Sequence, residues 1–183
     1  GVIYNLPQNM RVRIMKIILT NLFTSLFLIL PAEAFRVDGL KTPQSFIVDP
    51  ALGSYFISNI NGNPVSRDNN GFIMKLDRSG KILLSIHGGS PQITLHAPDG
   101  LALRGNNLYV TDIDSLRWFD KNSGKPLGNI DFTGIGVKRL RGLAFDDESN
   151  LYVSDVLANA IYKIETGNDH KISIFKKDNR LGN

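Results

Sequence analysis

Side chains that could do chemistry recur at one place in a repeated phrase of this 183-residue chain. Asp112 ends the phrase LYVTD, Asp155 ends LYVSD 43 positions later, and Asn59 ends the looser copy YFISN. Carboxylates and amides at such places could belong to a catalytic site, or they could accept hydrogen bonds from the backbone at a turn. Because the residue type repeats in every copy, we interpret these three side chains as acceptors that fix turns.

A second pair of candidates precedes the middle phrase. Asp99 lies between Pro98 and Gly100, and His96 lies two residues before Pro98. Asp99 could accept backbone hydrogen bonds at the tight turn into Gly100. His96 is a candidate general base near Asp99, since histidine is the side chain that most often transfers protons in catalysis. The alternative is a surface histidine, because the sequence shows no partner for it.

The phrases belong to a longer repeated unit. A second phrase precedes each copy, at Pro43–Asp49, Pro98–Arg104 and Leu140–Asp146, and a third follows it, at Phe72–Asp77, Leu116–Asp120 and Ile161–Glu165. Repeats of about 40 to 45 residues, built from short β-type segments and turns, are typical of propeller blades. The sequence therefore predicts an all-β chain of four-stranded blades.

The middle unit shows the expected strands best, at about 100–103, 108–111, 115–119 and 127–132. Apolar and polar residues alternate there, and Gly, Asn and Asp interrupt them. We place three blades at about 43–89, 97–134 and 140–179 within a partial β-propeller domain, 35–183. A closed propeller takes four to eight blades, so we expect a truncated chain. The first unit has a longer connection, 60–71, and lengthened loops often carry function.

The first 34 residues are typical of a leader. Residues 1–9 are interpreted as sequence that lies upstream of the natural start or was added by cloning, and 10–34 as a signal peptide that would begin as a short helix. Arg11, Arg13 and Lys16 precede the apolar stretch 17–30, and Ala32-Glu33-Ala34 offers a small-x-small cleavage site. The stretch is shorter than the roughly 20 residues needed to span a bilayer. We expect a secreted or periplasmic protein, with membrane attachment only through an uncleaved leader.

Composition excludes several classes of function. The chain has 21 basic and 17 acidic residues, and without the leader 18 and 16 remain, which is too balanced for a nucleic-acid partner. Cysteine is absent, so disulfides, thiolate metal sites and a cysteine nucleophile are excluded. We interpret Lys138, Arg139 and Arg141 as a solvated loop, and Trp118 and Phe119 as packing residues between blades.

The repeated phrases carry a family resemblance. The chain resembles the NHL-repeat propellers and the senescence-marker-protein/gluconolactonase family, both six-bladed, in PDGLAL, LYVTD, GLAFD and LYVSD. The segments 55–71 and 116–128 are similar to the secreted bacterial branch of the second group. The resemblance covers most of residues 37–180, and it is specific for the fold rather than for an activity.

The resemblance implies a site. Enzymes of that family hold one divalent cation, such as Ca²⁺ or Zn²⁺, at the channel mouth, with ligands placed just before the innermost strand of successive blades. Asp99 is the matching residue here, and Gln44 and Arg141 hold the equivalent places in the neighbouring units. Arg141 departs from the pattern because a guanidinium cannot ligate a metal.

Three possible functions follow. The first is a secreted propeller that binds a small ligand or protein partner at the channel mouth without catalysis, which agrees with Arg141. The second is a metal-dependent hydrolase of sugar lactones or related esters, in which a cation polarises the carbonyl group. A scaffold that recruits a partner through the long loop 60–71 is a third possibility.

Overall fold

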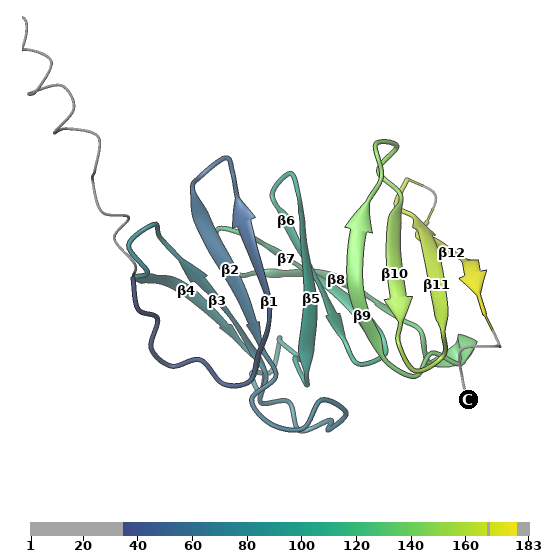
Figure 1. Cartoon of the computed structure of the whole chain (residues 1–183), viewed down its shortest axis with the longest axis horizontal. Helices are drawn as coiled ribbons and strands as arrows, with labels where there is room; N and C mark the ends of the chain where they lie inside the picture. Colours follow the sequence, from purple (N-terminus) through teal and green to yellow (C-terminus); the bar gives the residue numbers. More distant parts are fainter. Residues whose placement is uncertain (1–34, 168, 179–183) are drawn as a thin grey trace, which may run out of the picture. The chain divides into compact units, whose positions relative to one another are not determined.

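The computed structural model describes residues 35–167 and 169–178, and it is all-β, as the sequence predicts. The described part contains twelve strands in three four-stranded sheets, which we call blades 1, 2 and 3 (Figure 1). Blade 1 is formed by β1 (Pro43–Asp49), β2 (Ser54–Asn59), β3 (Phe72–Leu76) and β4 (Ile82–His87). Blade 2 is formed by β5 (Pro98–Arg104), β6 (Asn107–Asp112), β7 (Ser115–Asp120) and β8 (Pro126–Asp131). Blade 3 is formed by β9 (Leu140–Phe145), β10 (Leu151–Asp155), β11 (Ala160–Glu165) and β12 (Lys171–Lys177).

Each blade is an antiparallel meander in which every strand pairs with the next one along the chain. The innermost strands β1, β5 and β9 are neighbours in space, so each blade stacks on the following one (Figure 1). Each innermost strand pairs with its neighbour through an irregular register near its start, for example between Pro98 and Leu101 in blade 2. These irregular positions include the candidate residue Asp99.

Apolar layers between the blades form the core. One layer, around Phe56, Leu108 and Phe119, joins blades 1 and 2. Another, around Tyr109, Leu151 and Tyr162, joins blades 2 and 3. Each large apolar side chain buried there contributes about 1.5–3 kcal/mol to stability.

The predicted packing roles of Trp118 and Phe119 are confirmed. Phe119 is buried between blades 1 and 2, and Trp118 packs against the layer between blades 2 and 3. Both residues belong to β7, so their side chains point to opposite faces of blade 2.

One glycine permits the close stacking of blades 2 and 3. A Cβ atom on Gly100 would lie 2.0 Å from the backbone oxygen of Arg141. Only a residue without a side chain fits there, so β5 and β9 approach each other closely at the position next to Asp99.

Outside the strands, the described residues contain one 3₁₀ turn, Thr133–Ile135. No helix in the described part is long and apolar enough to span a bilayer. The predicted signal peptide, 10–34, and the upstream segment, 1–9, lie outside the described residues.

Candidate functional site

Hydroxyl groups join each blade to the next and position the candidate residues. Ser58 donates a hydrogen bond to the backbone oxygen of Asp99, and Thr111 donates to the backbone oxygen of Arg141 at 2.7 Å. The same Thr111 oxygen accepts from the N–H of Gly100 at 2.8 Å. Asp99 and Arg141 therefore occupy equivalent places in successive blades, as the repeat predicts.

The side chains at these places form one charged group, the rim cluster, made of Gln44, Asp99, Arg139 and Arg141. Asp99 is 5% exposed. One of its carboxylate oxygens lies 3.0 Å from a guanidinium nitrogen of Arg139 and 3.3 Å from Nε of Arg141. Arg141 also donates to the amide oxygen of Gln44 at 3.4 Å. The rim cluster thus joins three blades at the start of their innermost strands.

Burial dominates the electrostatics of Asp99. Burial raises the pKa of the Asp99 carboxyl, and the guanidinium groups of Arg141 and Arg139 offset part of that rise. The expectation that Lys138, Arg139 and Arg141 form a solvated loop was wrong for Arg139, whose side chain is only 17% exposed. The stacking of β9 on β5 brings this arginine onto a buried carboxylate.

His96 holds the long loop of blade 1 rather than contacting Asp99. Its Nδ1 accepts a hydrogen bond from the N–H of Asn69 at 3.1 Å, and its own N–H donates to the carboxylate of Asp112 at 2.9 Å. In the described part of the chain, no hydrogen bond or ion pair joins His96 to Asp99. The general-base role of His96 stays a prediction.

The recurring polar side chains at the end of the second strands, Asn59, Asp112 and Asp155, accept hydrogen bonds at turns, which confirms their interpretation as turn-fixing acceptors. The Asp112 carboxylate accepts from the N–H groups of His96 and Ala97 and pairs with Arg117 at 2.8 Å. The Asp155 carboxylate accepts from four backbone N–H groups, those of Lys138, Arg139, Leu157 and Ala158. Asn59 accepts from the N–H of Lys41. Each side chain therefore fixes the loop that leads into the innermost strand of its own blade.

The metal expectation stays a prediction. Among the described residues, no three side chains of His, Cys, Asp or Glu gather closely enough to hold a metal ion. One carboxylate oxygen of Asp99 is already paired with the guanidinium groups of Arg139 and Arg141, whereas a hard cation needs several oxygen ligands.

Sequence reasoning missed a second buried charge cluster, between blades 1 and 2. Lys121 pairs with Asp49 at 2.7 Å, and the Lys75 ammonium donates to the backbone oxygen of Lys121 and to Asn122, both at 3.1 Å. Burial raises the pKa of the Asp49 carboxyl. The hydrogen bond and charge of the neighbouring Lys121 ammonium act in the opposite direction, and the resulting pKa lies below its ordinary value. The available signal was Lys75 itself, a lysine within the otherwise apolar run Phe72–Leu76.

Comparison with known proteins settles the architecture. No protein-family model and no curated protein match the chain. A structure titled streptogramin B lyase has a TM-score of 0.57 and 14% identity, over 80% of this chain and 45% of that one. The fold is that of a β-propeller.

A protein of unknown function from Bacteroides caccae is also similar to this propeller chain, with a TM-score of 0.51 and 15% identity. That match covers 75% of this chain and 46% of the other. The chain thus spans less than half the length of either structure, and at these identities the likeness concerns the fold alone.

Proposed function

We propose that this chain belongs to an exported β-propeller that binds a small anionic ligand at the rim cluster. The observation that carries the proposal is the position of Arg141. Its side chain is 49% exposed while its Nε contacts the buried carboxylate of Asp99. A guanidinium has five N–H donors, and the contacts with Asp99 and Gln44 leave donors that face solvent.

The charge balance of the rim cluster supports an anion rather than a cation. Two guanidinium groups, those of Arg139 and Arg141, face the single carboxylate of Asp99, so the cluster carries one net positive charge. The buried carboxylate of Asp99 holds the Arg141 guanidinium through its Nε, which orients this group before any ligand arrives. A preorganised guanidinium is well suited to bind a carboxylate through two parallel hydrogen bonds.

Among small anions, the resemblance to the senescence-marker-protein/gluconolactonase family favours a hydroxylated carboxylate, such as a sugar acid, as the ligand. The Gln44 amide, 3.4 Å from Arg141, would add polar contacts for the hydroxyl groups. The alternative from the same resemblance, a metal-dependent lactonase, requires Asp99 to bind a cation in place of its guanidinium partners.

Calorimetric titration with sodium D-gluconate tests the proposal, with sorbitol as the neutral analogue. We expect gluconate to bind and Arg141→Gln to weaken binding at least tenfold, which corresponds to about 1.4 kcal/mol. Arg104→Gln is the matched control, because Arg104 is an exposed arginine at the other end of the innermost strand β5. Equal gluconate affinities for the two variants, or equal binding of sorbitol, would count against an anion site.

A further inference from the structure

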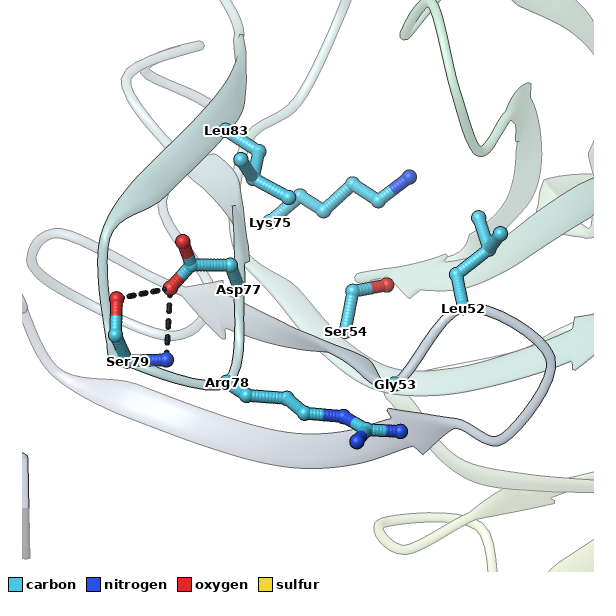
Figure 2. Close-up of a pocket in the computed structure, with 8 residues that line it drawn as sticks. All are labelled: Leu52, Gly53, Ser54, Lys75, Asp77, Arg78, Ser79 and Leu83. Carbon is cyan, nitrogen blue, oxygen red and sulfur yellow. Dashed lines mark hydrogen bonds between the residues drawn. The ribbon is translucent and has the colours of Figure 1, made fainter. Parts of the chain in front are cut away.

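A pocket lies on blade 1, lined by residues of the β1–β2 turn, the β3–β4 turn and the adjacent strands. Its volume is about 560 Å³, within the range of small-molecule sites. Figure 2 shows its lining residues: Leu52, Gly53, Ser54, Lys75, Asp77, Arg78, Ser79 and Leu83. None of them belongs to the rim cluster.

Ser54 is the first observation that points to a ligand. The residue is 2% exposed, and its hydroxyl oxygen has no hydrogen-bond partner among the described residues. A buried hydroxyl without a partner destabilises the fold, because it has lost its hydrogen bonds to water without replacing them. In Figure 2 the hydroxyl is directed toward the side on which the Lys75 ammonium and Leu52 lie. Since Ser54 and Lys75 are not hydrogen-bonded, they do not form a nucleophile and base pair.

Two cationic side chains give the pocket a positive wall. Arg78 is exposed and makes no ion pair in the described part of the chain. Its guanidinium lies across Gly53, where a Cβ atom would be only 2.2 Å from Nε. Lys75 adds an ammonium group that keeps one N–H beyond its two hydrogen bonds.

The acidic groups nearby are already engaged. Asp77 accepts hydrogen bonds from the N–H and hydroxyl of Ser79 and from the N–H of Lys81. Asp49 pairs with Lys121. Lys75 and Arg78 bring two positive charges to the pocket wall and Asp77 brings one negative charge, so the lining carries one net positive charge, which favours an anion.

The rest of the pocket is apolar. Leu52 is 57% exposed and Leu83 is 54% exposed, although both belong to the pocket wall. A ligand that covered the exposed half of each leucine would remove apolar surface from water, which favours binding. The wall thus combines an aliphatic surface with a guanidinium and an unpaired hydroxyl.

We propose that this pocket binds a carboxylate carried on a short aliphatic chain. The carboxylate would pair with the Arg78 guanidinium and accept a hydrogen bond from Ser54, and the chain would lie against Leu52 and Leu83. This site is separate from the rim cluster and does not depend on the function proposed there.

Calorimetry with sodium octanoate as the probe tests this site, with sodium acetate and 1-octanol as partial analogues. We expect one octanoate per chain, and binding at least tenfold weaker for each analogue. Arg78→Met and Leu83→Ala should each weaken octanoate binding at least fivefold. Arg36→Met and Leu127→Ala are the matched controls, since Arg36 is an exposed arginine outside the pocket and Leu127 is 45% exposed on the outer strand β8. Both variants should bind octanoate as tightly as the unchanged protein.

The Ser54→Ala variant distinguishes a ligand-binding role of the Ser54 hydroxyl from a purely structural one. Because the hydroxyl is unpaired in the free protein, its removal should raise the thermal midpoint without ligand and weaken octanoate binding. Absence of octanoate binding, equal binding of 1-octanol, or equal losses in the control variants would overturn the proposal. Unchanged octanoate affinity in Ser54→Ala would remove the hydroxyl from the site and overturn the assigned geometry.

Discussion

Replacing Thr111 with valine should weaken the junction between blades 2 and 3 while keeping the shape of the side chain. The Thr111 hydroxyl accepts from the N–H of Gly100 at 2.8 Å and donates to the backbone oxygen of Arg141 at 2.7 Å. Thr111 is fully buried, so water cannot easily replace it. Each unpaired buried group costs about 1–3 kcal/mol. The Gly100 contact is buried and the Arg141 contact only partly buried, so we expect Thr111→Val to lower the free energy of unfolding by about 2–4 kcal/mol.

The repeat supplies a matched control at Ser154, the equivalent residue of blade 3. Its hydroxyl accepts from the N–H of Gly142 at 3.0 Å in an exposed setting, so water can replace it. Ser154→Ala should cost less than about 1 kcal/mol. Urea denaturation followed by fluorescence measures both variants, because the single tryptophan, Trp118, packs against the layer between blades 2 and 3. Equal losses in the two variants would refute the role assigned to the hydroxyl.

Three other changes test the buried contacts. Gly100→Ala should lower the free energy of unfolding by about 2 kcal/mol or more, because the new Cβ would lie 2.0 Å from the backbone oxygen of Arg141. Gly134→Ala is the control, since a Cβ there would have nothing within 4 Å, and urea denaturation measures the stability of both variants. Asp49→Asn should lower the free energy of unfolding by about 3–5 kcal/mol, since it leaves the buried Lys121 ammonium unpaired. The loss should be larger above pH 4, where Asp49 of the unchanged protein is ionised, and a smaller loss there than below pH 4 would contradict this. Burial lowers the pKa of Lys75, so the folded state binds fewer protons than the unfolded state and stability should rise as pH approaches 10.5; Lys75→Met should remove that rise in a pH series of thermal midpoints.

The sequence predicted the architecture because the blade is a local unit. Alternating apolar residues and turn residues specify each meander within about 45 residues, and the repeat then identifies equivalent positions. The equivalence of Asp99 and Arg141 follows the same logic, since both occupy one place in neighbouring blades, but their ion pair was not predicted. The turn-fixing role of Asp112 and Asp155 was predictable because a function repeated in every blade is structural.

The contacts between blades were not predictable in the same way. Arg139 reaches Asp99 from 40 residues away, and Lys75 reaches Asn122 from 47 residues away. Such pairs depend on how neighbouring sheets stack and which rotamers the stacking leaves open, which no local pattern encodes. The unpaired hydroxyl of Ser54 is likewise visible only once its surroundings are known.

The Asp99→Asn variant tests the central claim most directly, because the two accounts of the rim cluster predict opposite results. If the cluster binds anions, the variant frees the guanidinium groups of Arg139 and Arg141 from a competing carboxylate. Calorimetric titration should then show gluconate binding several-fold tighter than in the unchanged protein, with Ca²⁺ affinity unaltered. A loss of Ca²⁺ binding together with unchanged or weaker gluconate binding would contradict the anion site and favour a metal-binding Asp99.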